Sequence, residues 1–227
     1  MLTGILGGTF NPFHNGHLRH ALEVKESLGL DRVIIMPCAD PPHKDNKELL
    51  DFALRVKLSK AAISDVHGLE LSEIEETLPY PSYTWQTLTE LRRRYPSEKI
   101  FFMMGVESFA ALDKWHRGLE LPHLACLVVV PREESDIELF HQTIYNFWSG
   151  PHHIVREDSQ PNKNHKETVE LHGDGKCIFL QTPRLDISST AIRKKWKEGK
   201  SLAGLVPEKE LKILHSYKET LSLCWPH

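Results

Sequence analysis

Two histidines near the N-terminus stand at a spacing that could hold phosphate. His14 and His17 lie three residues apart in the string Gly-Gly-Thr-Phe-Asn-Pro-Phe-His-Asn-Gly-His, which covers residues 7–17. Residues at positions i and i+3 share one face of a helix, so both rings can reach one ligand. Before them, Gly7 and Gly8 let backbone N–H groups approach an anion closely. A helix start adds N–H groups without a helical partner and the positive end of the dipole, so the string predicts a phosphate-binding site.

A second string of residues toward the C-terminus could also bind phosphate. Residues 187–193 read Ile-Ser-Ser-Thr-Ala-Ile-Arg. Ser188, Ser189 and Thr190 are typical of a helix N-terminus with hydroxyl caps. Arg193 lies one turn further on and can offer a fork of donors to a phosphate. Each string alone has a plainer interpretation, a tight turn or an ordinary capped helix, but two such helix starts in one chain favour phosphate binding.

Short apolar runs alternate with helical patterns along the chain. The expected strands are Leu2–Leu6, Val33–Met36, Ile100–Met104, Leu127–Val130 and Ile178–Leu180, with a further strand at 69–74. The expected helices are 17–28 ending at Gly29, a segment with Leu49, Ala53, Val56, Lys57 and Ala61 on one face, 84–92, 136–148, and two after Ser189 split by 199–207. Residues 150–175 are rich in turn residues and charge and are expected to form a long loop. Near-continuous apolar strands are typical of a parallel sheet that is covered on both faces.

This alternation predicts an α/β fold, a doubly wound, mostly parallel, Rossmann-like sheet with helices on both faces and a small C-terminal helical part. We expect a single domain over residues 1–227, with 184–227 as the helical subregion. In such a sheet, ligands bind beyond the carboxyl ends of the strands. The loops to examine are therefore 7–17, 37–44, 105–108 and 183–193, and both strings fall among them.

Composition excludes several classes of protein. The formal net charge is -3, so nothing indicates a nucleic-acid or membrane partner, and no run is long enough for a membrane span. The N-terminus lacks the pattern of a secretion signal, and the four cysteines stand singly, so we expect a cytoplasmic protein without a zinc site or disulfide framework. No His-Glu-x-x-His string occurs, so no protein metal site is expected. The oligomeric state stays open, a homo-oligomer included.

Three common motifs are absent. Gly199-Lys200-Ser201 resembles the end of a P-loop, but Lys194 stands where that motif needs glycine. No Gly-x-Gly-x-x-Gly follows the first strand, which argues against a dehydrogenase fingerprint. No Gly-x-Ser-x-Gly elbow occurs, which argues against an α/β-hydrolase.

Together, the His-x-Gly-His and Ile-Ser-Ser-Thr-x-Ile-Arg strings resemble those of the nucleotidyltransferase superfamily, which shares its "HIGH" signature with class I aminoacyl-tRNA synthetases. The chain is most similar to the bacterial nicotinate-nucleotide adenylyltransferases within it. The further matching segments are Pro41-Pro42-His43-Lys44, Ser82-Tyr83-Thr84 with Thr87-Leu88, Gly105 with Ser108 and Trp115, and Leu205-Val206-Pro207. The resemblance covers roughly residues 1–210, except 132–175.

The resemblance implies a transferase of NAD biosynthesis. The 5′-phosphate of nicotinate mononucleotide attacks the α-phosphorus of ATP, and deamido-NAD and pyrophosphate are released. This phosphate is already anionic near neutral pH, with a second pKa near ~6, so no general base is needed. Catalysis must then come from positioning and from stabilising charge on phosphates. Mg²⁺ is expected to arrive with ATP.

The resemblance also implies residue roles. The implied catalytic residues are His14, His17, Arg193 and Lys44. The implied ATP-binding residues are Gly7, Gly8, Thr9, Phe10, His17, Asp186, Ser188, Ser189, Thr190 and Arg193. The implied mononucleotide-binding residues are Thr84, Gly105, Glu107, Trp115 and His116, with Trp115 stacking on the pyridine ring and backbone N–H groups of Thr84 and His116 receiving the carboxylate.

The chain departs from the family pattern at three places. Glu107 replaces an aspartate, His116 replaces a common tyrosine, and Cys38-Ala39-Asp40 replaces a segment that often contains asparagine. A nicotinamide-mononucleotide or dual-specificity enzyme therefore stays an alternative. Pantetheine-phosphate adenylyltransferase is disfavoured by Ser82-Tyr83-Thr84 and Trp115. An inactive nucleotide-binding regulator is disfavoured because His14, His17 and Arg193 are all present.

Overall fold

A computed structural model describes residues 1–41, 46–133, 135–148, 153–157, 166–171 and 175–225. The helices are α1 (Asn15–Leu28), α2 (Phe52–Ile63), α3 (Thr84–Arg94), α4 (Val106–Ala110), α5 (Asp136–Phe147), α6 (Ser189–Lys197), α7 (Glu208–Ser216) and α8 (Lys218–Cys224). The strands are β1 (Leu2–Gly8), β2 (Arg32–Pro37), β3 (Leu69–Leu71), β4 (Lys99–Gly105), β5 (Cys126–Val130), β6 (His153–Glu157), β7 (Lys166–Glu170) and β8 (Lys176–Leu180). Short 3₁₀ helices are η1 (Asn46–Glu48), η2 (Ile74–Thr77), η3 (Leu112–Lys114) and η4 (Gly118–His123).

The chain folds into two compact units, each built from three segments. The first unit contains Met1–Gly7, Glu23–Val33 and Tyr83–Pro183, and the second contains Gly8–Leu22, Ile34–Ser82 and Arg184–His227. No helix in the described part of the chain is both long and apolar enough to cross a membrane.

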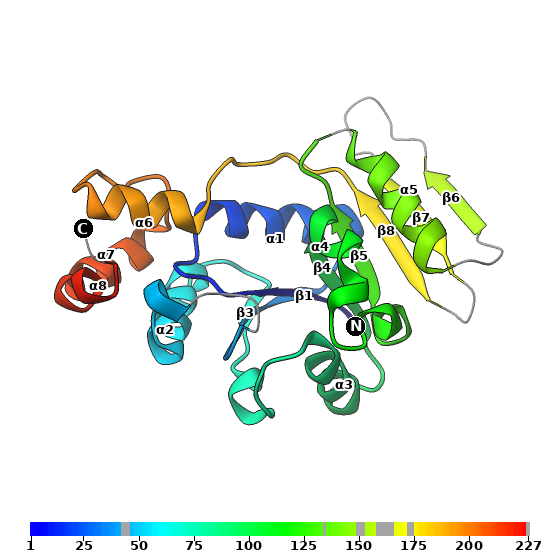
Figure 1. Ribbon diagram of the computed structural model, residues 1–227, viewed down its shortest axis with the longest axis horizontal. Coiled ribbons are helices and arrows are strands. Elements are labelled where there is room, and N and C mark those ends of the chain that lie inside the picture. Colours follow the sequence, from blue (N-terminus) through cyan, green and yellow to red (C-terminus); the bar gives the residue numbers. More distant parts are fainter. Residues whose placement is uncertain (42–45, 134, 149–152, 158–165, 172–174, 226–227) are drawn as a thin grey trace. The chain divides into compact units, whose positions relative to one another are not determined.

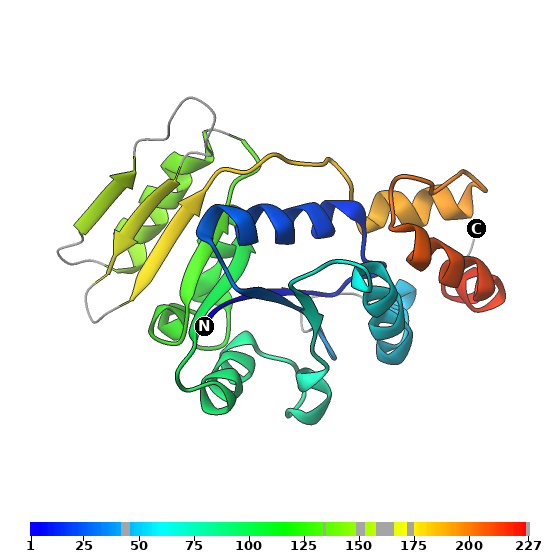
Figure 2. The ribbon, with the colours of Figure 1, turned by 180° about the vertical axis from the view of Figure 1, so that it is seen from behind.

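The first unit is built on a sheet with the strand order β1-β4-β5-β8-β7-β6. The pairs β1·β4, β4·β5 and β5·β8 are parallel, and β8·β7 and β7·β6 are antiparallel. Helix α5 runs along the β7–β8 part of this sheet, as both views show (Figures 1 and 2). Its Phe140 ring packs on Phe179 of β8 at 5.4 Å between ring centroids. The α/β fold with a mostly parallel sheet is confirmed.

The apolar runs form strands where the sequence predicts them, because they are buried on both faces. In β5, Leu127, Val128 and Val129 are all fully buried. Burial of such a side chain contributes about 1.5–3 kcal/mol, which outweighs any local preference for another structure. Gly29 ends α1 with φ +60°, as predicted for a residue just after a helix.

The prediction of one long loop over 150–175 is wrong, because its described residues include β6 and β7. Val155 pairs with Thr168, and Thr168 pairs in turn with Ile178 of β8. Strand β6 lies at the edge of the sheet, and β7 lies between β6 and β8. Both antiparallel strands mix charged and apolar residues in sequence, so they give a weaker strand signal than the continuous apolar runs. In β7, Val169 is nevertheless buried.

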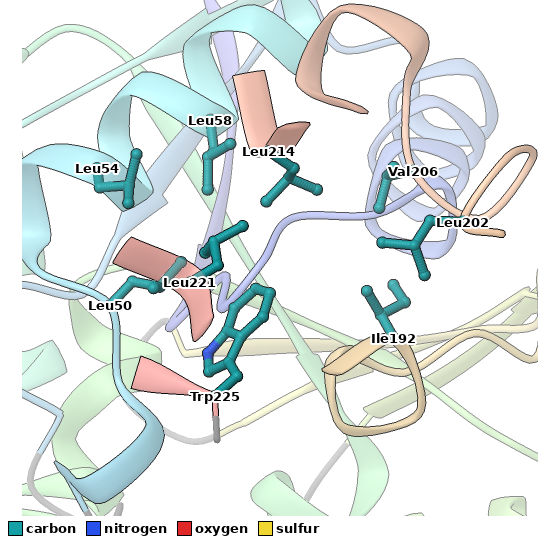
Figure 3. Packing of buried hydrophobic residues seen from close by; sticks show 9 residues of the cluster. All are labelled: Leu50, Leu54, Leu58, Ile192, Leu202, Val206, Leu214, Leu221 and Trp225. Carbon is teal, nitrogen blue, oxygen red and sulfur yellow. The ribbon is translucent and has the colours of Figure 1, made fainter. Parts of the chain in front are cut away.

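The second unit contains β2 beside β3, α2 and the C-terminal helices. Helices α6, α7 and α8 lie together, in orange to red in Figure 1. Figure 3 shows the apolar cluster that joins them to α2 and the residues before it. Its members are Leu50, Leu54, Leu58, Ile192, Leu202, Val206, Leu214, Leu221 and Trp225.

Two details of this unit differ from expectation. The buried face of α2 carries Leu54, Arg55 and Leu58, whereas Ala53 and Lys57 of the predicted face are exposed. The buried face of α2 therefore differs from the predicted face. The reason is that Arg55 is buried, whereas a hydrophobic pattern predicts that an arginine lies in solvent. After α6 there are two helices instead of one, because the chain turns at Tyr217, between α7 and α8, without a glycine or proline to signal it.

Candidate functional site

The string at residues 7–17 forms the end of β1, a turn and the start of α1. Phe10 has φ +47° and is buried, so the turn holds its ring under the backbone. A Cβ at Gly8 would lie 2.7 Å from Cε1 of Phe10, which leaves no room for any other residue at position 8. Glycine is therefore required at position 8 by close packing of the turn.

His14 and His17 are brought together at the start of α1. Their rings stack at 3.5 Å between centroids with an angle of 17°. The backbone N–H of His17 donates to Nδ1 of His14 at 3.2 Å, and the N–H of Leu18 donates to the carbonyl of His14 at 3.1 Å. His14 thus caps the helix with its own ring. The rings of Phe10 and Phe13 also pack on His17, with their centroids 4.9 and 5.2 Å from the centroid of the His17 ring.

This cap fixes the tautomer of His14. Because Nδ1 accepts a hydrogen bond, the proton of the neutral ring is on Nε2, which is then a donor. Burial lowers the pKa of His14 to about 4, so the ring is neutral at pH 7. His14 therefore offers an N–H donor rather than a positive charge.

The glycine between the two histidines is explained by the same geometry. A Cβ at Gly16 would lie 3.0 Å from Nδ1 of His14 and 3.3 Å from the carbonyl oxygen of Leu185. A side chain at position 16 would require the His14 ring to shift by a few tenths of an ångström. The spacing His-x-Gly-His is thus the pattern that permits this arrangement.

Helix α6 begins as predicted and reaches the same turn. Ser188 caps the helix, and its Oγ accepts from the N–H of Ala191 at 3.1 Å. Ser189 donates from Oγ to the carbonyl of Pro12 at 2.9 Å. Arg193 donates from Nη1 to the carbonyl of Asn11 at 3.0 Å. The two strings, about 180 residues apart in sequence, therefore meet within the second unit.

The remaining ATP-binding candidates and the catalytic candidate Lys44 lie at different places in the chain. Asp186 is exposed and pairs with Arg184. The carbonyl of Thr9 accepts from Nη1 of Arg55 at 2.8 Å. Gly7 ends the part of β1 that belongs to the first unit. Lys44 lies outside the described residues.

A buried arginine that sequence reasoning missed supports this turn. Arg55 is 1% exposed and donates to four backbone carbonyls. These belong to Thr9, Cys38, Ala39 and Leu50. A single side chain thereby ties the turn after β1 to the segment after β2 and to the start of α2. The only sequence signal is an arginine between two apolar residues of a helix.

The mononucleotide candidates lie in the first unit. Thr84 is the first residue of α3. Next to it, the Tyr83 ring stacks on His116 at 4.6 Å, with an angle of 25°. Trp115 is half-buried, and its backbone N–H donates to the carbonyl of Leu112 at 3.1 Å. The structure thus brings the Tyr83-Thr84 and Trp115-His116 segments together.

Gly105 and Glu107 stand where β4 passes into α4. Gly105 precedes the helix, and Glu107 lies in its first turn. The Glu107 carboxylate forms an ion pair with Arg132 at 2.9 Å, and both side chains are more than half exposed. The longer side chain that replaces the family's aspartate is therefore held by a partner at the end of β5.

No group of three or more His, Cys, Asp or Glu side chains that could hold a metal ion occurs among the residues with described positions. The donors around the two helix starts are imidazole, hydroxyl and guanidinium groups. Mg²⁺ prefers oxygen ligands such as carboxylates and phosphates, so this donor set suits phosphate better than the metal itself.

The model of the cytidylyltransferase-like family matches residues 5–195, which include both strings. The chain belongs to the cytidylyltransferase-like family. A relative from Desulfatibacillum aliphaticivorans, named as a probable nicotinate-nucleotide adenylyltransferase, is 38% identical over 92% of this chain and 94% of its own length. Another of the same name, from Shewanella putrefaciens, is 39% identical over 88% of this chain and 90% of its own length.

A solved structure extends the comparison of this cytidylyltransferase-like chain to the fold. The Plasmodium falciparum nicotinic acid mononucleotide adenylyltransferase, complexed with NaAD, matches with a TM-score of 0.66. The match covers 95% of each chain at 14% identity, so it shows a shared fold.

Proposed function

We propose that this chain transfers the adenylyl group of ATP to nicotinate mononucleotide, giving deamido-NAD and pyrophosphate in NAD biosynthesis. The full-length relatives named for this reaction support the proposal. The single structural observation that carries it is the stacked pair His14 and His17, with Arg193 held on the carbonyl of Asn11 in the same unit.

The reaction needs phosphate-binding groups and no proton acceptor. An oxygen of the mononucleotide phosphate forms a bond to the α-phosphorus of ATP, and the bond from that phosphorus to the bridging oxygen of pyrophosphate breaks. We assign His17 to the α-phosphate, where negative charge grows in the transition state. His14 donates from Nε2 to the attacking or leaving phosphate, and its neutral state suits a donor that must not trap the product.

We assign Arg193, with Ser189 and Thr190, to the β- and γ-phosphates. The guanidinium is permanently charged, and the first N–H groups of α6 add donors at a positive dipole end. We propose that Mg²⁺ arrives on the phosphates of ATP and neutralises part of their charge. The side chains here hold and orient the phosphates.

We assign the mononucleotide to the first unit, through Thr84, Trp115 and His116, with Gly105 and Glu107 near the ribose. The stacked rings of the half-buried Tyr83 and the exposed His116 support a site for a flat ring. The four free cysteines, two of them with pKa values raised to about 12 by burial, agree with a reducing cytoplasm as the place of action.

The test is an assay with two substrates. Purified protein is incubated with ATP, Mg²⁺ and either nicotinate or nicotinamide mononucleotide, and pyrophosphate and the dinucleotide are measured. The proposal predicts turnover with the acid form at a kcat/KM at least about tenfold above that of the amide. A preference for the amide would favour the alternative specificity, and the Glu107–Arg132 pair is where its cause should be sought.

A further inference from the structure

A glutamate outside both strings holds the phosphate-binding arginine. Oε2 of Glu48 accepts from Nε of Arg193 at 3.0 Å, and Oε1 accepts from Nζ of Lys197. Arg193 and Lys197 are four residues apart on α6 and so lie on one face. The carboxylate thus bridges two cations of the helix whose start is assigned to the terminal phosphates.

The backbone of Glu48 is anchored independently of this ion pair. Its carbonyl accepts from Nδ2 of Asn11 at 2.7 Å and from Nε1 of Trp225 at 2.9 Å. Asn11 also accepts the N–H of Leu50 on its Oδ1 at 3.2 Å. Residue 48 therefore keeps its place between the turn after β1 and the C-terminal cluster even if its side chain changes.

The bonds of Arg193 leave part of its guanidinium for a ligand. Nε is bound to Glu48, one N–H of Nη1 to the carbonyl of Asn11 at 3.0 Å, and Nη2 makes a long contact of 3.5 Å with Oγ1 of Thr190. A guanidinium has five N–H groups. Among the described residues, one N–H of Nη1 and one of Nη2 have no partner in these bonds, and such a fork matches two oxygens of a phosphate.

We propose that Glu48 is a positioning residue for ATP, which fixes the guanidinium of Arg193 with its Nη1–Nη2 fork presented to the terminal phosphates. This inference rests on the proposed function. Without the carboxylate, the long side chain of Arg193 regains rotamer freedom, and that freedom must be lost again when phosphate binds. Arg193 and Lys197 together carry a formal charge of +2, and the Glu48 carboxylate lowers the charge of the three groups to +1. The lower positive charge favours release of pyrophosphate.

A purely stabilising role for this ion pair does not fit its exposure. The Glu48 side chain is 36% exposed, against 15% for Arg193 and 26% for Lys197, so the pair is partly solvated and contributes only modestly to the free energy of unfolding. Hydrogen bonds from Lys197 and then Arg193 lower the pKa of Glu48, so the carboxylate stays ionised at neutral pH. Its removal should therefore change phosphate binding more than stability.

The test compares Glu48→Ala and Glu48→Gln with Glu208→Gln, which breaks the exposed pair of Glu208 with Lys212 in the same unit. Initial rates are measured against ATP and against the mononucleotide. We expect the KM for ATP to rise about tenfold in Glu48→Ala and less in Glu48→Gln, which keeps one acceptor oxygen. The KM for the mononucleotide should stay within about twofold, and Glu208→Gln should match the wild type.

Calorimetric binding of inorganic tripolyphosphate, without a mononucleotide, gives a readout independent of turnover. The affinity should fall about tenfold in Glu48→Ala and stay unchanged in Glu208→Gln. Equal affinities in wild type and Glu48→Ala, no binding to the wild type, or unfolding of both Glu48 variants would overturn the inference. If the wild type turned over neither mononucleotide, the proposed function would fail, whereas this binding comparison would still decide the role of Glu48.

Discussion

The backbone N–H of His17 donates to Nδ1 of His14 at 3.2 Å, while the two rings stack at 3.5 Å. The same contact caps α1, fixes the donor on Nε2 of His14 and aligns the two imidazoles. Burial keeps His14 a neutral donor at neutral pH, while Arg193 of α6 and the buried Arg55 of α2 supply permanent positive charge in this part of the second unit.

Replacement of His17 should remove transition-state stabilisation. We expect His17→Ala to lower kcat by about 100-fold or more, the usual cost of losing one donor to a developing negative charge. The exposed His67 offers a matched control, and His67→Ala should keep kcat within about twofold. Steady-state kinetics, with thermal unfolding to verify the fold, check this, and a loss below tenfold in His17→Ala would contradict the assigned role.

Removal of Arg55 should destabilise the second unit. Arg55→Met would leave four carbonyls without their donor, so we expect the free energy of unfolding to fall by about 3 kcal/mol or more. Arg93→Met, which breaks a surface pair with the less exposed Glu90, should leave the free energy of unfolding close to that of the wild type. Urea unfolding measures both changes, and similar losses in the two variants would show that the buried bonds of Arg55 contribute little.

Much of the fold and of the site could be predicted from the sequence, because the signals are local. The apolar run within Cys126–Val130 and the serine that caps α6 are short patterns that can be recognised in the sequence alone. The roles of Glu48 and Arg55 could not be predicted, because their partners are far away in the sequence. Glu48 lies 145 residues from Arg193, and only the folded chain brings them together.

The pH dependence of stability should reveal a half-buried histidine, His20. Burial lowers the pKa of His20 from 6.5 to about 4, and its Nε2 lacks a hydrogen-bond partner in the described part of the chain. Between these values, the unfolded chain binds a proton that the folded chain does not, so stability falls as the pH falls from 6.5 to 4. The difference corresponds to roughly 3 kcal/mol at most.

His20→Leu should therefore lose less stability than the wild type over this range. Burial also lowers the pKa of His14 to about 4. Stability therefore falls with pH for this second reason too, equally in the wild type and in His20→Leu. Urea unfolding at a series of pH values gives the two slopes. Identical slopes would mean that His20 does not stay neutral in the folded chain.

Glu210 should make the protein less stable as the pH rises, which is opposite to the effect of His20. It is fully buried, both its oxygens lack partners among the described residues, and burial raises its pKa well above 4.5. As the pH rises above 4.5, the unfolded chain releases a proton that the folded chain keeps, so stability falls. We expect Glu210→Leu to raise the free energy of unfolding at pH 7 by about 1–3 kcal/mol. A lower stability of this variant at pH 7 would contradict the assignment.

The central claim is adenylyl transfer to nicotinate mononucleotide, and the most direct measurement is the dinucleotide formed from ATP, Mg²⁺ and each mononucleotide. We predict deamido-NAD and pyrophosphate in equal amounts, with the acid preferred over the amide at least about tenfold in kcat/KM. The absence of pyrophosphate and dinucleotide with the acid form, from a protein that is folded by its unfolding curve, would contradict the account.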